Sequence, residues 1–179
     1  MLTAALACYF VSLGQYPGWQ QAVDYTMDIT LDTALHQYDG TMTVTLKNNS
    51  PDALDKAYFH LFFNAFQPES MMDVRSRTIE DPDRRVGARI AELPEEEWGW
   101  VNVSSLSVNG KAVDFTHDGT ILDVTLHDAI RAGKKATFTM KWTAQVPRQI
   151  RRSGWMNKEG VEYSMTQWYP KLCEYDHDG

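Results

Sequence analysis

One cluster of side chains suited to ligand binding lies near the end of the chain, at residues 164–171. Here a run that predicts a strand ends in Gln167, followed by two aromatic residues and a proline. Aromatic rings supply contact area, and a carboxamide supplies directed hydrogen bonds. We therefore interpret Gln167 and Trp168 as candidate substrate-binding residues on the rim of a cleft. Simple packing of these side chains in a core is the alternative.

A second cluster concentrates positive charge at residues 148–154. It contains Arg148, Arg151 and Arg152 and ends in Gly154. Guanidinium groups bind carboxylates through paired hydrogen bonds, so this segment could pair with a carboxylate-bearing surface or ligand. A solvated loop with no partner is the alternative.

The sequence holds no recognisable catalytic motif. A hydrolytic zinc site needs three protein ligands and an open position for water. The five histidines are not paired at i and i+4, and neither HExxH nor GxSxG nor a phosphate-binding P-loop occurs. The carboxylates show no spacing that singles out an acid/base pair. We predict no catalytic residue and no metal ligand in this chain.

Composition narrows the class of partner further. The 179 residues carry a net charge of −7, which argues against nucleic acid as a partner because nucleic-acid binders present a basic face. Two cysteines are too few for a disulfide scaffold or a four-cysteine zinc site. With 43% hydrophobic residues, the chain can bury a sizeable core.

The elements that must position these clusters read as strands. Apolar and polar residues alternate over residues 25–32, 41–47 and 136–143, as half-buried strands require. Residues 122–126 and 161–166 predict further strands, and the dense apolar run 58–63 predicts a strand covered on both faces. The pairs Asp39-Gly40 and Asn109-Gly110 predict turns. No helical periodicity is present, so we expect an all-β, antiparallel sandwich of about seven strands.

Residues 67–99 interrupt this pattern with a long, polar and aperiodic segment. A loop of this length inside a compact domain is usually functional or ordered by a partner. The alternative is a solvated excursion with local ion pairs.

Residues 1–14 carry no charge and are mostly apolar, which is typical of a signal peptide with cleavage before Gln15. Lipidation at Cys8 is a second possibility, and a buried or disordered N-terminal segment is a third. We expect an exported protein: periplasmic, outer-membrane-associated or secreted. Residues 15–179 would then form one β-rich domain, truncated where a further domain begins, although a natural flexible tail is also possible.

Several segments, taken in order, resemble a known family. They are NNSPDAL at residues 48–54, YFHLFFNAF at 58–66, SMMDVRSR at 70–77, QIRRSG at 149–154 and MTQWYPK at 165–171, together with residues 31–40. The chain from residue 19 onward resembles the N-terminal domain of aminopeptidase N-type zinc metallopeptidases. The segments 70–77 and 149–154 resemble one bacterial subgroup, many of whose members are exported.

This resemblance implies a saddle-like β-rich domain that caps the substrate cleft of a thermolysin-like catalytic domain. The family's zinc-binding HExxH and its GxMEN motif do not occur here. Zinc and catalysis are therefore expected in a catalytic domain of the same polypeptide, and this piece alone is expected to be inactive. Gln167 best matches the family residue that reaches the free amino group of the peptide substrate.

An alternative from a different class is a self-standing, exported β-sandwich that binds a carbohydrate or a partner protein. Four tryptophans of this exported chain motivate it: Trp98, Trp100, Trp155 and Trp168.

Overall fold

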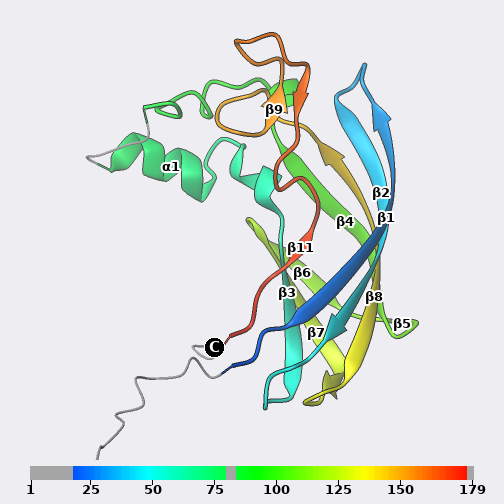
Figure 1. Cartoon of the computed structure of the whole chain (residues 1–179). Coiled ribbons are helices and arrows are strands. Elements are labelled where there is room, and N and C mark those ends of the chain that lie inside the picture. Colours follow the sequence, from blue (N-terminus) through cyan, green and yellow to red (C-terminus); the bar gives the residue numbers. More distant parts are fainter. Residues whose placement is uncertain (1–17, 80–83, 177–179) are drawn as a thin grey trace, which may run out of the picture.

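Two antiparallel sheets face each other in the computed structural model, which describes residues 18–79 and 84–176. One sheet has the order β1-β2-β8-β4-β5, formed by Ala22–Asp32, Gln37–Lys47, Lys135–Gln145, Trp100–Val108 and Lys111–Ala112. The other has the order β11-β3-β7-β6, formed by Lys171–Leu172, Leu54–His60, Ile121–Ile130 and Phe115–Asp118. Figure 1 shows this sandwich, which confirms the all-β prediction. The predicted signal peptide and Cys8 lie outside the described residues.

The alternating sequences form the long strands as expected. Along β2 and β8, every second residue is buried, and the antiparallel register sets Met42 opposite Met140 and Val44 opposite Phe138. β1 lies at the sheet edge, where its alternate side chains are half-buried. The period of two in the sequence thus becomes one packed face and one solvated face.

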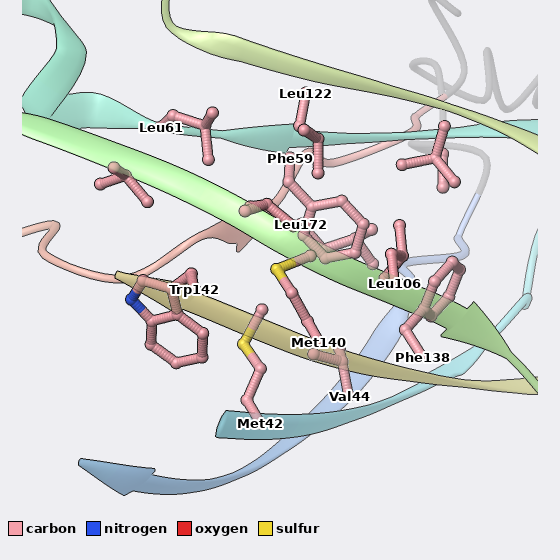
Figure 2. Close-up of a cluster of buried hydrophobic side chains, with 14 of the residues drawn as sticks. Met42, Val44, Phe59, Leu61, Leu106, Leu122, Phe138, Met140, Trp142 and Leu172 are labelled. Carbon is pink, nitrogen blue, oxygen red and sulfur yellow. The ribbon is translucent and has the colours of Figure 1, made fainter. Parts of the chain in front are cut away.

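The core fills the space between the two sheets (Figure 2). Phe59 of β3 and Phe138 of β8 meet edge to face, with ring centroids 5.5 Å apart, and neither is exposed to solvent. Trp142 and Met140 extend the packed layer along β8. Burial of such side chains contributes about 1.5–3 kcal/mol each, so this layer is the main source of stability.

The predicted turn at Asp39-Gly40 is wrong, because both residues lie inside β2. Gly40 pairs with Trp142, and a Cβ atom at position 40 would lie 2.2 Å from the indole ring. The glycine is therefore needed for close approach and not for a turn. The chain reverses instead at residues 33–36, where the Asp32 carboxylate accepts hydrogen bonds from the Ala34 and Leu35 N–H groups at 2.8 and 3.1 Å.

The predicted hairpin at Asn109-Gly110 is confirmed. The pair joins β4 to β5, and both residues have positive φ, 50° and 80°. Positive φ at both central positions is the geometry of the type I′ turn, which matches the twist of the flanking strands.

Two other strand predictions need correction. The dense run at 58–63 is not one strand covered on both faces: β3 ends at His60 with Tyr58 exposed, and the run continues into a 3₁₀ helix, η1 (Phe62–Ala65). Aromatic residues accumulate here because two elements share the segment. At 161–166 only Tyr163–Ser164 (β10) is a strand, and it pairs with Gly154–Trp155 (β9).

The polar excursion at 67–99 contains an α-helix, α1 (Met71–Thr78), and a 3₁₀ helix, η2 (Glu95–Glu97). Ser70 caps α1 by accepting a hydrogen bond from the Asp73 N–H, and the Asp73 carboxylate accepts hydrogen bonds from the Glu69 N–H and the Arg77 guanidinium. α1 buries Asp73 and Ser76 and exposes Met71, so its apolar residues do not mark its inner face. This inversion is why the sequence shows no helical period.

The last described segment joins the four-stranded sheet. The Leu172 N–H donates a hydrogen bond to the Tyr25 hydroxyl at 3.0 Å, and the Cys173 N–H donates one to the Tyr58 carbonyl at 2.7 Å. Cys173 carries a free thiol that is half-buried, and this burial raises its pKa. Within residues 18–79 and 84–176, no helix has the length and apolar character needed to cross a membrane.

Candidate functional site

A cavity of about 350 Å³ lies between η1, α1 and the segments 151–153 and 166–167, which flank the β9–β10 pair. Figure 1 shows α1 and β9 toward the same end of the sandwich. The cavity brings together the two clusters that the sequence singled out, because Gln167, Arg151 and Arg152 all line it. Most of the other lining residues are apolar: Phe62, Phe63 and Ala65 of η1, Phe66 directly after it, and Met72 of α1. Ser153 and Thr166 complete the lining. Sequence reasoning missed this apolar lining.

Ser153 holds the backbone next to Gln167. Its buried hydroxyl donates to the Thr166 carbonyl at 2.5 Å and accepts a hydrogen bond from the Thr166 N–H at 3.0 Å. Just before this contact in both segments, Ser164 donates from its hydroxyl to the Arg152 carbonyl at 2.6 Å. These bonds fix segment 151–153 against segment 164–166, so Arg152 and Gln167 lie on two segments that are hydrogen-bonded to each other.

Gln167 itself has a φ of 55°, in the left-handed region that non-glycine residues seldom adopt. Its side chain is exposed and lines the cavity. Uncommon backbone conformations of this kind are concentrated at functional sites, where the surrounding structure imposes them. Here the Ser153–Thr166 bonds are part of that surrounding structure.

Gly154 allows the two segments to approach. Its φ is 144°, and a Cβ atom there would lie 2.3 Å from the Gln149 Cα atom. Across the same turn, the Gln149 N–H donates to the Trp155 carbonyl at 3.2 Å, and the Trp155 N–H donates to the Pro147 carbonyl at 3.0 Å. A glycine is therefore required for the turn that presents the arginines.

The structure separates the two predicted substrate-binding residues. Whereas Gln167 faces the cavity, Trp168 does not line it and is half-buried. The Trp168 ring packs edge to face on Tyr38 and on Tyr169, with centroids 5.8 and 5.3 Å apart, and its carbonyl accepts a hydrogen bond from the Tyr38 hydroxyl. Burial raises the pKa of the Tyr38 hydroxyl, which keeps it a hydrogen-bond donor. The packing of Trp168 thus anchors the backbone next to Gln167.

The arginines of the predicted cluster also lie in different places. Arg148 lies over the Trp155 ring, with its guanidinium carbon 4.4 Å from the ring centroid, and His36 stacks on the same indole at 3.9 Å. His36 in turn contacts the Tyr163 hydroxyl through Nδ1 at 2.6 Å. Arg148 is therefore part of the packing between the β1–β2 turn and β9, and the arginines at positions 151 and 152 are left at the cavity.

Residues 67–99 pack on their own domain. The buried Gln145 side chain donates hydrogen bonds to the Glu95 and Trp98 carbonyls, each at 2.9 Å. Arg89 donates to the Gln149 carbonyl at 3.0 Å, and Gln67 donates to the Gly99 carbonyl at 3.1 Å. The described part of the excursion is therefore held against its own domain, and it contributes Met72 to the cavity.

The described histidines are dispersed. His60 stacks on Phe62 at 4.7 Å, and His117 accepts a hydrogen bond from the Val103 N–H at 3.0 Å. Burial lowers the pKa of both imidazoles. Among residues 18–79 and 84–176, no three His, Cys, Asp or Glu side chains are grouped to hold a metal ion.

A second cavity of about 350 Å³ lies beside the first half of β3 and residues 172–175. None of the predicted site residues lines it. The chemistry available at the first cavity is more distinctive, because it combines an amide that donates and accepts, two guanidinium groups and an apolar floor.

Comparison with known proteins finds relatives at the level of structure. No family model and no curated protein matches the sequence. The M1 zinc metallopeptidase from Deinococcus radiodurans superposes on 89% of this chain with a TM-score of 0.52 and 15% identity. A mutant of it bound to a Tyr-Ser-Ala substrate matches 85% of the chain with a TM-score of 0.52 and 16% identity. A two-domain M1 zinc metallopeptidase mutant bound to L-tryptophan matches 90% with a TM-score of 0.52 and 18% identity.

This chain spans only 29–31% of the length of those three proteins. At such identities the similarity establishes a shared fold. The sandwich is thus the fold of a part of the M1 zinc metallopeptidases, in agreement with the resemblance found in the sequence.

Proposed function

We propose that this chain is the non-catalytic N-terminal capping domain of an exported, zinc-dependent, aminopeptidase-like metallopeptidase. In this role it forms one wall of the cleft in which N-terminal residues are removed from peptides. The observation that carries the proposal is the placement of Gln167, exposed on a cavity and held at positive φ, in a chain that has the fold of part of an M1 metallopeptidase.

The chemistry of Gln167 suits the amino end of a peptide. A carboxamide oxygen accepts a hydrogen bond from an ammonium group, and a fixed acceptor holds the first residue of a substrate in one position. The bonds from Ser153 to Thr166 and the packing of Trp168 on Tyr38 hold the backbone on both sides of this residue.

Exposed apolar side chains at the same end support a contact with a catalytic domain of the same polypeptide. Met71 of α1 is 86% exposed, Leu35 of the β1–β2 turn 59% and Met156 beside β9 57%. Figure 1 shows these three elements at one end of the sandwich. Large apolar side chains exposed on a domain surface can mark a contact with a partner.

In this proposal the zinc ion is bound by the catalytic domain and not by this chain. The described residues offer no set of ligands for it, so the metal is assigned to the catalytic domain together with the hydrolytic step. What this chain supplies is the position of the substrate's amino group and the exclusion of water from one side of the cleft.

Hydrolysis of alanine p-nitroanilide by the parent polypeptide tests the proposal. Gln167→Ala should lower kcat/KM by about 10- to 100-fold, the effect of one hydrogen bond to a charged group. Gln167→Glu keeps the acceptor and should retain most of the activity. Gln20→Ala, which changes an exposed glutamine far from the cavity, is the matched control.

Two results would contradict the proposal: stoichiometric zinc with clear turnover by the 179-residue chain alone, or full activity of Gln167→Ala in the parent. Less binding of an apolar-surface dye to the parent than to this chain would support the domain contact. N-terminal sequencing of the exported protein would test cleavage before Gln15.

The carbohydrate-binding alternative gains no support from three of its four tryptophans, Trp98, Trp155 and Trp168. The Trp98 indole N–H donates to the Leu93 carbonyl at 2.8 Å, and the Trp155 ring is covered by Arg148 and His36. Trp168 packs on Tyr38. Rings committed in this way offer little free face to a sugar.

A further inference from the structure

The cavity at Gln167 has a charge opposite to that of the chain. Among the described residues that line it, two are arginines and none is Asp or Glu, in a chain with a net charge of −7. The lining is otherwise apolar or uncharged. An acidic protein that gathers only cations at one cavity favours an anionic ligand there.

The backbone that carries the arginines is held from several directions. The Arg152 carbonyl accepts a hydrogen bond from Ser164, and Ser153, the next residue, is bonded to Thr166. Arg89 donates to the Gln149 and Ile150 carbonyls, which precede the arginine pair. The backbone of Arg152 is therefore held beside the segment that leads to Gln167.

The rest of the lining suits a carboxylate on an aliphatic stem. Phe62, Phe66 and Met72 present apolar surface to the same cavity. A volume of about 350 Å³ accommodates one or two amino-acid side chains, near the lower limit of ligand pockets. The planar fork of a guanidinium matches the two oxygens of a carboxylate through paired hydrogen bonds.

We propose that this cavity binds the carboxylate of an acidic peptide, through the Arg152 guanidinium and against the floor formed by Phe62, Phe66 and Met72. The inference rests on the proposed function, because it takes the ligand to be the peptide whose amino group Gln167 accepts. It adds a substrate class to that function: peptides with a carboxylate within reach of their amino end. The carboxylate can belong to a Glu or Asp side chain or to the C-terminus of a short peptide.

Peptide titration of the 179-residue chain, followed in ¹H–¹⁵N NMR spectra, tests the inference without catalysis. The probes are tripeptide amides with one Glu at the first, second or third position and Ala elsewhere, each compared with its Gln counterpart. Tri-alanine with a free or an amidated C-terminus forms the second arm. We expect at least one carboxylate peptide to bind about fivefold more tightly than its neutral counterpart, with shifts in the Gln167 side-chain amide and the arginine Nε–H signals.

Variants locate the effect. Arg152→Gln should reduce the preference to about twofold or less, and Arg152→Lys should retain part of it because the charge stays and the fork is lost. Lys158→Gln is the matched control: it removes one exposed cation from the same end of the molecule, but Lys158 does not line the cavity. The preference should also weaken as salt is added, since the guanidinium groups are exposed.

A preference in the side-chain arm or in the C-terminal arm supports the proposal and identifies the source of the carboxylate. Equal affinity for every charged and neutral pair, or no binding of any peptide, would overturn it. An equal loss of preference in Lys158→Gln and Arg152→Gln would overturn it too, because net charge would then be the cause. Failure of the parent to hydrolyse anilides would count against the proposed function alone and would not alter this binding measurement.

Discussion

The sandwich and the end that carries the cavity are stabilised in different ways. In the sandwich, paired strands bury alternate side chains, and Phe59, Phe138 and Trp142 are almost inaccessible to solvent. In the other region, formed by residues 61–79, 84–99 and 146–169, side chains such as Ser153 and Arg89 bind backbone groups of distant segments. The second region also contributes buried apolar side chains to the core, such as Phe63, Ile90 and Ile150, but its segments are joined in addition by these individual side-chain hydrogen bonds.

The two regions also differ in what they expose. The long strands bury their apolar residues, whereas α1 buries the Asp73 carboxylate and leaves Met71 86% exposed. A helix that hides a carboxylate and displays a methionine is not placed to complete the core of this domain. The strands therefore supply most of the buried core, and the cavity end is where we propose an interaction.

The largest expected effect tests the sandwich itself. Phe138→Ala removes a ring that meets Phe59 between the sheets, and it should lower the free energy of unfolding by about 3–5 kcal/mol. Tyr58→Ala, at an exposed position beside Phe59, should cost about 0.5 kcal/mol. Urea denaturation measures both. Similar costs for the two variants would contradict the view that interior packing governs this region.

A second prediction concerns Gly40 in the centre of β2. Gly40→Ala should destabilise the domain by about 1–3 kcal/mol, because its new methyl group meets the Trp142 ring. Gly110→Ala is the matched control: its site is open, and only the positive φ opposes the substitution, at a cost of about 1 kcal/mol. Thermal unfolding of both variants ranks them, and a larger loss for Gly110→Ala would refute the packing explanation.

Ser153→Ala tests whether the sandwich and the cavity end open independently of each other. Loss of the hydroxyl leaves the Thr166 N–H without its acceptor, so the local opening free energy around residues 151–167 should fall by about 1–2 kcal/mol. Hydrogen exchange should show faster exchange of the Thr166 amide and unchanged protection in β8. Ser104→Ala, whose exposed hydroxyl binds the Lys141 carbonyl, is the control. Equal acceleration in β8 and at Thr166 would mean that the two regions open together.

The smallest expected effect is a pH dependence confined to α1. Burial alone raises the pKa of the Asp73 carboxyl, but hydrogen bonds from Arg77 and from the Glu69 N–H outweigh it, so the pKa is lowered overall. The resulting stabilisation is present above the unfolded value of about 3.9 and is lost as the pH falls through the lower folded value. NMR signals of α1 should therefore lose dispersion below about pH 4, earlier than those of β8.

Asp73→Asn checks this assignment. The amide cannot titrate, so the transition of α1 in this acidic window should disappear, and α1 should be weaker at neutral pH because the charged pair with Arg77 is gone. Persistence of the same transition in the Asn variant would assign it to another group.

The sandwich could be predicted well because the sequence signals for its strands and hairpin each lie within a few neighbouring residues. Alternation along β2 and β8 and the Asn109-Gly110 pair each specify structure within a few residues. Asp39-Gly40 misled for the same reason: the demand on Gly40 comes from Trp142, which is about a hundred positions away in the chain. A turn signal and a close-approach signal look alike when only neighbours in sequence are considered.

The cavity end was predicted only in part. The types of residue at Gln167 and Arg151–Arg152 pointed to a binding site, but nothing local could show that they line one cavity. The apolar floor from η1 and α1, and the packing of Trp168 on Tyr38, depend on contacts between distant segments. α1 was missed because its signals are a Ser70 cap and an Asp73–Arg77 pair, without an apolar stripe facing inward.

The half-buried Cys173 makes the opening of the last described segment measurable by thiol alkylation. Only the thiolate reacts readily with alkylating reagents, and the raised pKa of this thiol keeps the thiolate fraction small at neutral pH. Its backbone is bonded to Tyr58 of β3, so detachment of the β11 segment would expose the thiol fully. In a variant with Cys8 replaced by Ser, the alkylation rate of Cys173 should therefore increase with the fraction of time that this last segment is detached from the sheet.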